Sequence, residues 1–296
     1  MTIKNLVLTG GGPHGLCELG AVSQLIKKGV IDLNKIEKIY GTSVGGVVAV
    51  VLSLGYDMEY IYDYYVTRPW EKAEGLDIET DDILEIFTCG GFLDKFFEFL
   101  CKEVFFKFCD VKGLCKDITL KEFYEKTGKE LYLYTIELSN FETVELSYKS
   151  HPDMTLVKAV QMSSSLPPVF KPIEYECKLY MDGGAIHNYP LDYCLKDNNP
   201  EETYGITFDT SSYEGKEEFN MEKMNVPLYY MFLFNKFFNL ACTTNRQTKI
   251  KNEINIPVTC GAGNMTLWKE FFTSVECRQE LWNRGIESVN AKLDIK

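Results

Sequence analysis

Ser43 lies between two glycines in the pattern Gly41-Thr42-Ser43-Val44-Gly45, a spacing that can expose a serine hydroxyl as a nucleophile. A short β-prone run precedes it at 36–40, and an apolar run follows at 47–52. Gly-x-Ser-x-Gly between a strand and a helix is typical of a nucleophile elbow, where a sharp turn exposes the hydroxyl. We therefore expect Ser43 to be a nucleophile, although the pattern also occurs in ordinary Gly/Ser turns.

A second glycine-rich turn lies near the amino terminus. Residues 5–9 read as a buried strand, and Gly10-Gly11-Gly12-Pro13-His14-Gly15 leads from it into an amphipathic helix. Such a loop can bind a phosphate or an oxyanion, because backbone N–H groups are unpaired where a helix begins. The loop also fits Gly-x-Gly-x-x-Gly, so a dinucleotide-binding fold is the rival interpretation. The rival is weakened because the second strand ends in Ser43 instead of an acidic residue, and because Pro13 lacks an N–H.

An aspartate occupies the end of a later strand, where residues 178–181 run into Asp182-Gly183-Gly184. Sites in α/β folds lie at the carboxyl edge of the sheet, so Asp182 is a candidate base for Ser43. By itself Asp182 also fits an Asx-type turn. His187 could complete a Ser–His–Asp triad, but elbow hydrolases order the triad Ser…Asp…His with a distant histidine, so a triad is the lesser alternative.

Composition excludes several classes of protein. The 296 residues are 45% apolar and 25% charged, which is typical of a folded globular chain. The net charge of −12 argues against nucleic acid as a partner and against membrane binding by bulk electrostatics. Ten cysteines without a Cys-x-x-Cys pair, and only three histidines, do not form a zinc pattern, so we expect free thiols and no metal. Without a signal peptide or a bilayer-length apolar run, we expect a cytoplasmic chain.

The remaining elements must position these groups. Residues 131–138 and 144–148 alternate as a hairpin, and Thr119 to Glu122 forms a capping-box pattern. Further segments read as the strand 204–208 and as the helices 156–162, 226–243 and 267–293. Neither repeats nor linkers interrupt the order. We therefore predict one α/β domain over 1–296, with a mostly parallel central sheet, helices on both faces and a helical cap-like insertion at about 75–130.

The ordered motifs resemble the patatin-like phospholipase family, which carries a Gly-Gly-Gly-x-basic-Gly loop, then Gly-x-Ser-x-Gly, then Asp-Gly-Gly. Further similarities are the segment 162–170 and Asn188-Tyr189-Pro190, and the resemblance covers 5 to about 208. It implies a patatin-like, α/β-hydrolase-related sandwich and a serine acyl hydrolase of phospholipase A or lysophospholipase type. The implied substrates are phospholipids or other fatty-acyl esters, cleaved through an acyl-enzyme with transient membrane contact and without metal or cofactor.

The resemblance also implies a role for each motif residue. Ser43 and Asp182 would form a catalytic dyad as nucleophile and base, and the N–H groups of Gly11 and Gly12, with Gly10 close behind, would bind the oxyanion. The implied motif glycines are Gly15, Gly41, Gly45, Gly183 and Gly184. This chain departs from the family at His14, where the family has Arg or Lys. His14 would give either a pH-dependent positive charge at the oxyanion site or a structural hydrogen bond, and both readings stay open.

The segment 92–109 reads as an amphipathic helix with a surplus of phenylalanines. Phe96, Phe99 and Phe106 lie outside its apolar packing stripe, so we predict that they touch lipid near the site entrance, unless a neighbouring helix covers them.

Overall fold

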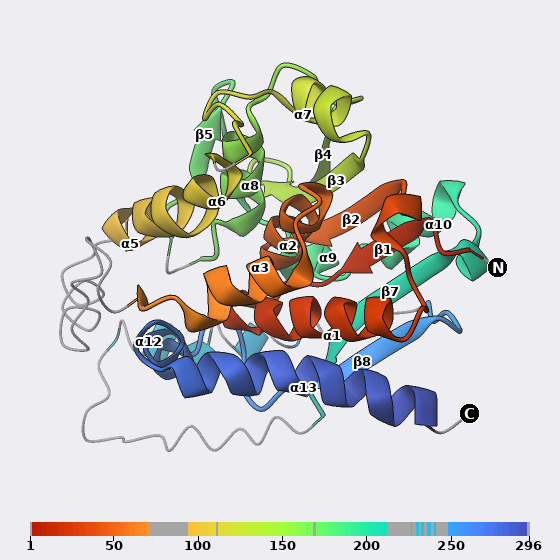
Figure 1. Cartoon of the computed structure of the whole chain (residues 1–296). Helices are drawn as coiled ribbons and strands as arrows, with labels where there is room; N and C mark the ends of the chain where they lie inside the picture. Colours follow the sequence, from red (N-terminus) through yellow and green to blue (C-terminus); the bar gives the residue numbers. More distant parts are fainter. Residues whose placement is uncertain are drawn as a thin grey trace.

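A single central sheet carries the motif residues. The computed structural model describes residues 2–70, 94–110, 112–167, 170–211 and 248–294, together with scattered positions between 226 and 240. Within these residues the sheet has eight strands in the order β5-β6-β3-β2-β1-β7-β8, with β4 paired to β3 (Figure 1). The strands are β1 Asn5–Leu8, β2 Lys38–Thr42, β3 Glu130–Glu137, β4 Glu142–Ser147, β5 Ile173–Tyr175, β6 Lys178–Asp182, β7 Thr203–Asp209 and β8 Glu253–Pro257.

The sheet has a parallel centre and an antiparallel edge. Strands β3, β2, β1, β7 and β8 are parallel to their neighbours in that order, whereas β4 and β6 pair antiparallel with β3 and β5 pairs antiparallel with β6. The α/β class and the mostly parallel sheet are confirmed. Sequence patterns did not predict β5 and β8, because both are short and polar residues interrupt them.

Helices cover both faces of the sheet, so strand residues are buried whichever way they point. Leu6 and Leu8 belong to the larger core cluster, which includes residues of α1, α2, α8 and α13. Val7 points to the other face, where Leu191 and Cys194 of α10 pack. The helix bounds are α1 Gly15–Lys27, α2 Val44–Ser53, α3 Met58–Tyr62, α5 Asp94–Phe99, α6 Lys107–Asp110, α7 Leu120–Thr127, α8 Leu156–Ser164, α9 Gly184–His187, α10 Leu191–Asp197, α12 Met265–Thr273 and α13 Val275–Asp294.

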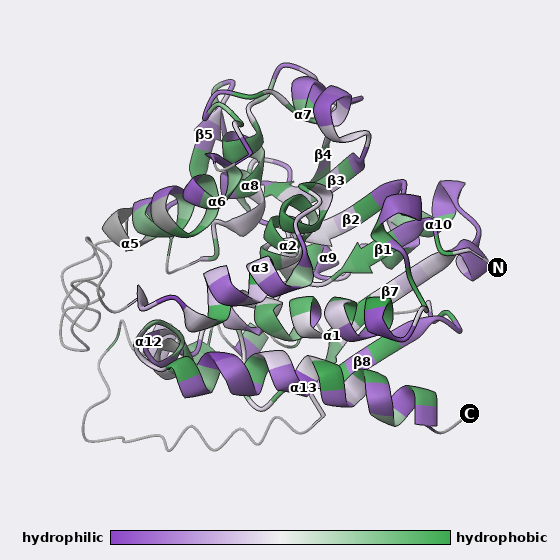
Figure 2. Ribbon diagram, viewed as in Figure 1, coloured by the Kyte–Doolittle hydropathy of each residue, from purple (hydrophilic) through white to green (hydrophobic). Residues whose placement is uncertain are grey.

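The carboxyl-terminal helix α13 lies directly against α1 (Figure 1). The two backbones meet at glycines: a Cβ on Gly20 would lie 2.0 Å from the Trp282 carbonyl oxygen, and one on Gly285 would lie 2.0 Å from that of Cys17. Figure 2 shows hydrophobic residues on the central strand β1 and a mixture of hydrophilic and hydrophobic residues along α13.

The prediction of a single helix over 267–293 is wrong in one respect. Two helices, α12 and α13, cover this segment, and the helical geometry is interrupted at Ser274 between them. Ser274 is extended, with φ −124° and ψ 120°, and its Oγ accepts a hydrogen bond from the Cys277 N–H at 3.1 Å. A serine that satisfies an N–H of the first turn acts as an N-cap, so a second helix begins there. The capping box at Thr119 and Glu122 is confirmed, with both reciprocal bonds formed.

The predicted insertion is helical at 94–110 and 120–127 with turns between them, and residues 71–93 and 111 lie outside the described residues. Two π-helical segments, Asp63–Thr67 and Leu100–Phe106, pack near each other, with the Tyr65 hydroxyl 3.5 Å from the Val104 carbonyl oxygen. Buried Arg278 of α13 fixes the first segment by donating to the carbonyl oxygens of Val66 and Arg68. No helix among the described residues is long and apolar enough to cross a bilayer.

The prediction that surplus phenylalanines of 92–109 touch lipid is wrong for Phe99. Its side chain is 5% exposed and packs edge-on against Phe272 of α12, with ring centroids 5.6 Å apart. Phe106 is half-buried, and the side chain of Phe96 lies outside the described residues. A helix from the last third of the chain provides the cover, which helical periodicity within 92–109 could not reveal.

Candidate active site

Ser43 occupies a strained turn between β2 and α2. Its φ of 55° and ψ of −127° are rare for a residue with a side chain, and such strain persists only where the surroundings hold it. Its N–H donates to Ser163 Oγ at 3.0 Å, and Ser163 Oγ donates to the Tyr134 carbonyl at 2.7 Å. The turn needs Gly41, because a Cβ there would lie 2.5 Å from the Gly45 carbonyl group. The expected elbow geometry is present.

Asp182 lies at the end of β6 and is 1% exposed. Its Oδ1 accepts the Gly184 N–H at 2.7 Å, and its own N–H donates to the Ser165 carbonyl at 3.0 Å. Burial raises the pKa of the Asp182 carboxyl to about 6, against smaller opposite effects of Ser43 and the Gly184 N–H. Removal from water disfavours the charged form, so this carboxylate is a stronger base than one on the surface.

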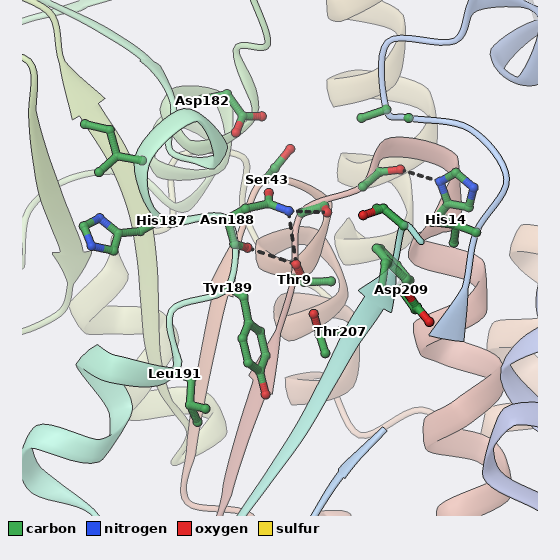
Figure 3. Close-up of a pocket in the computed structure, with 18 of the residues that line it drawn as sticks. Thr9, His14, Ser43, Asp182, His187, Asn188, Tyr189, Leu191, Thr207 and Asp209 are labelled. Atoms are coloured by element: carbon green, nitrogen blue, oxygen red, sulfur yellow. Dashed lines mark hydrogen bonds between the residues drawn. The ribbon is translucent and has the colours of Figure 1, made fainter. Parts of the chain in front are cut away.

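Ser43 and Asp182 face each other across the edge of the sheet (Figure 3). The Ser43 hydroxyl is close enough to lower the pKa of the carboxyl by hydrogen bonding, yet Asp182 Oδ2 has no partner at regular hydrogen-bond geometry among the described residues. Oδ2 is thus a buried acceptor on the carboxyl group that faces Ser43.

The glycine loop approaches Ser43 closely. A Cβ on Gly10 would lie 3.1 Å from Ser43 Cβ and 2.3 Å from Asn188 Oδ1, so only glycine fits there. The Gly10 N–H donates to the Asn188 carbonyl oxygen at 3.0 Å, which corrects the expectation that Gly10 is an oxyanion donor. The N–H groups of Gly11 and Gly12 donate to no acceptor among the described residues. These two remain the candidate donors.

The remaining motif glycines allow close backbone contacts near the site. A Cβ on Gly15 would lie 2.5 Å from Val44 Cγ2, and one on Gly183 would lie 2.5 Å from the Tyr134 carbonyl oxygen. A Cβ on Gly45 would lie 2.8 Å from the carbonyl oxygen of Leu8. These contacts bring the elbow, the glycine loop and the Asp182 turn within reach of one another.

His14 lies beside the loop and is 2% exposed. Its Nδ1 bonds the Gly11 carbonyl oxygen at 3.0 Å, and its ring packs against Phe208 at 5.5 Å between centroids. The pKa of His14 is lowered to about 4, mainly by burial; the Gly11 hydrogen bond opposes this shift, and the positive charge of Arg284 adds a smaller lowering effect. The imidazole is therefore neutral at pH 7. Of the two expected roles, the geometry supports the structural hydrogen bond.

His187 does not join Ser43 and Asp182. Its Nδ1 bonds Thr143 Oγ1 at 2.7 Å, its ring packs edge-on against Tyr193, and Figure 3 shows it directed away from Ser43. The Thr42 hydroxyl donates to the His187 carbonyl oxygen at 2.8 Å. The geometry therefore gives His187 a structural place and offers no support for a triad.

Two cavities meet at Ser43. A polar one of about 220 Å³ also contains Asp182, Asn188 and Asp209, together with Gly10 and Gly11. An apolar one of about 140 Å³ is formed by valines of α2, by the described insertion helices and by α12. Among its lining residues are Val47, Val51, Phe97, Val104, Trp268 and Phe271. The nucleophile candidate thus lies on the boundary between a polar and an apolar space.

A family model for patatin-like phospholipases matches residues 6–195, which contain the glycine loop, Ser43 and Asp182. The chain belongs to the patatin-like phospholipase family. This assignment confirms the resemblance seen in the motifs.

Individual proteins are similar to this chain over much of its length. A probable lipid hydrolase of Invertebrate iridescent virus 6 is 31% identical over 206 residues, covering 66% of this chain and 64% of that protein. An uncharacterised protein of Acanthamoeba polyphaga mimivirus is 27% identical over 98% of this chain and 94% of its own length. The crystal structure of VipD from Legionella pneumophila has the same fold, with a TM-score of 0.58 and 16% identity over 99% of this chain and 67% of that one.

Within this patatin-like site, sequence reasoning missed several contributors. Asn188 was noted only as part of Asn-x-Pro, although its side chain bonds both the Gly10 carbonyl oxygen and Thr9 Oγ1. Glu18 is fully buried, and its Oε1 accepts the Thr9 N–H at 2.8 Å while burial raises its pKa. The apolar wall formed by α12 lies in the last third of the chain, where no family motif was found, so no sequence pattern indicated that it lines the site.

Proposed function

We propose that this chain is a serine lipid acyl hydrolase of phospholipase A or lysophospholipase type. Ser43 is the nucleophile and Asp182 the base of a dyad, and the Gly11 and Gly12 N–H groups bind the oxyanion. The observation that carries the proposal is the position of Ser43, which is held at a strained elbow, opposite a buried carboxylate and between a polar and an apolar cavity.

The proposed reaction has two halves. Ser43 Oγ attacks the ester carbonyl carbon as its proton passes to Asp182 Oδ2, and the negative carbonyl oxygen accepts hydrogen bonds from the loop. The C–O bond to the alcohol then breaks, and the alcohol leaves with the proton from Asp182. Water attacks the acyl-enzyme while Asp182 takes its proton, and the proton returns to Ser43 as the fatty acid leaves. Every group is a side chain or a backbone amide, so the scheme involves no metal or cofactor.

The cavities suggest how an acyl ester lies in the site. The apolar cavity suits the acyl chain, because burying methylene groups there removes them from water at roughly 0.8 kcal/mol each. The polar cavity suits the alcohol part, which carries oxygens that need hydrogen-bond partners. A lipid bound this way has its ester carbon at Ser43. Such a substrate would be drawn from a membrane surface, so transient membrane contact is part of the proposal.

A direct test is hydrolysis of a fatty-acyl ester by the purified chain. Wild type and Ser43→Ala are compared on a lysophospholipid and on a soluble p-nitrophenyl ester. Turnover by wild type and loss of at least about 10³-fold in the variant would support the proposal. A folded wild type that hydrolyses neither ester would instead identify a non-catalytic relative.

A further inference from the structure

We infer that Asn188 and His14 are positioning residues, which fix the orientation of the two backbone donors proposed for the oxyanion. The inference rests on the proposed function and adds two residues to it, neither of which touches the reacting atoms. Its starting point is a pair of hydrogen bonds. Asn188 Nδ2 donates to the Gly10 carbonyl oxygen at 3.0 Å, and His14 Nδ1 lies 3.0 Å from the Gly11 carbonyl oxygen (Figure 3).

The geometry of the peptide bond links these carbonyls to the donors. A peptide unit is planar and trans, so its C=O and its N–H point in opposite directions. The Gly10 carbonyl and the Gly11 N–H share one unit, and the Gly11 carbonyl and the Gly12 N–H share the next. Holding the first carbonyl on Asn188 therefore turns the Gly11 N–H away from Asn188. His14 holds the second carbonyl with its ring at 3.0 Å and with its backbone N–H at 3.3 Å, which turns the Gly12 N–H away from His14; the ring supplies the shorter bond.

The two residues that carry the released N–H groups line the cavities that meet at Ser43. Gly11 lines the polar cavity and Gly12 the apolar one, and Ser43 lines both. Neither N–H has an acceptor among the described residues. A carbonyl turned to the same place would repel a developing oxyanion, so the orientation of each unit decides whether it helps or hinders the reaction.

External anchors are needed because the loop is made of glycine. Glycine reaches both signs of φ at similar cost, so Gly10-Gly11-Gly12 has little preference of its own for one peptide orientation. Gly12 has φ +57°, which shows that the loop uses this freedom. Asn188 is itself fixed, because Thr9 Oγ1 donates to its carbonyl oxygen at 3.1 Å. The same residue therefore connects the loop to the turn that carries Asp182.

The state of His14 agrees with this role. A carbonyl oxygen can only accept, so Nδ1 must carry the proton, and the buried Nε2 has no partner among the described residues. The imidazole is the neutral Nδ1–H tautomer. The residue at this position therefore acts as a hydrogen-bond donor to the loop and not as a positive charge.

The test replaces each donor with a group of similar shape that cannot donate. Asn188→Asp turns the amide into an acceptor, and His14→Leu removes the ring N–H. Asn198→Asp is the matched control, because Asn198 Nδ2 also donates twice, to Tyr40 Oη and the Cys194 carbonyl, away from Ser43. His14→Gln restores a donor. We expect kcat to fall about 10- to 100-fold in the first two variants with KM within about threefold, and less in His14→Gln.

A second readout separates positioning from loss of folded enzyme. An alkyl trifluoromethyl ketone forms an anionic tetrahedral adduct with the serine, so its Ki measures oxyanion binding independently of the folded fraction. We expect Ki to rise by the same factor as kcat falls in Asn188→Asp and His14→Leu, and to stay constant in Asn198→Asp.

Unchanged Ki values, or equal losses in Asn198→Asp, would overturn the positioning role while leaving a hydrolase that depends on Ser43. A wild type without Ser43-dependent hydrolysis would instead overturn the proposed function, and this inference with it.

Discussion

Ser43 and Asp182 stand on opposite sides of one strand, β3. Thr42, the residue before Ser43, pairs with Tyr134, and Asp182 pairs with the next residue, Thr135. The first pairing is parallel and the second antiparallel, so β2 and β6 run in opposite directions and their last residues meet beside two adjacent residues of β3. The dyad geometry is thus set by the sheet register, and a rigid sheet needs no third residue to align the two groups.

The first prediction concerns Asp182→Asn. The amide keeps the shape of the carboxylate but is not a base, so hydrolysis should fall by about 10³-fold or more. The folded protein should meanwhile gain stability above pH 6. The raised pKa means that burying the charge costs free energy there, on the order of 1–3 kcal/mol.

This gain in stability should vanish below about pH 4, where the wild-type carboxyl is protonated in both the folded and the unfolded state. Urea unfolding at pH 8 and pH 3.5, combined with turnover at pH 8, measures both effects. An active Asp182→Asn variant would rule out this residue as the base.

The second prediction is a pH profile with a single low-pH limb. Asp182 must be ionised to accept a proton, so kcat/KM should rise as the pH increases through about 6 and then level off. His14 should add no step between pH 6 and 9, because burial lowers its pKa to about 4. Rates on a soluble ester between pH 4.5 and 9 show the limb. A midpoint of the kcat/KM profile near pH 4, or a second step near pH 7, would show that a group other than Asp182 is the base.

The third prediction is that His187→Ala stays active. Its ring bonds Thr143 and lies away from Ser43, so its loss should change kcat less than about fivefold and cost some stability. His151→Ala serves as a comparison, since its Nδ1 bonds only the neighbouring Ser150 Oγ among the bonds described. Turnover of both variants at equal folded concentration is the measurement. A loss in His187→Ala as large as in Ser43→Ala would restore the triad.

The fourth prediction concerns the apolar cavity. Val104→Phe adds bulk to its wall, in a cavity of about 140 Å³. Hydrolysis of a long-chain ester should fall severalfold, while hydrolysis of an acetyl ester should stay nearly constant, because only the long chain needs the space. kcat/KM across acyl lengths from two to sixteen carbons shows the difference. An equal loss of kcat/KM for every acyl length would show that the acyl chain does not bind in this apolar cavity.

Much of this site could be predicted from local sequence. The glycines around Ser43 and the turn after Asp182 mark strand ends, so both residues could be placed at turns beside the sheet. The antiparallel pairing of β6 with β3, which brings Asp182 to Ser43 from the opposite direction, is not visible in local sequence. The loop donors could be predicted only in part. Nothing local indicates that the Gly10 N–H is taken by the Asn188 carbonyl oxygen, a contact across 178 residues.

The apolar half of the site could not be predicted for a similar reason. Trp268 and Phe271 line the cavity from α12, and Phe272 of the same helix covers Phe99. Helical periodicity shows which side of a segment is apolar but not which element will cover it. Local periodicity therefore favours lipid contact for the phenylalanines of 92–109, whereas Phe99 packs on α12.

The central claim is that Ser43 forms the acyl-enzyme, and the most direct test is a fluorophosphonate probe followed by peptide mass spectrometry. Phosphonylation requires an activated serine, so the adduct should map to Ser43 alone, with one probe per chain. It should disappear in Ser43→Ala and slow strongly in Asp182→Asn. An adduct on another serine, or no adduct on a folded chain that still hydrolyses lipid ester, would contradict the account.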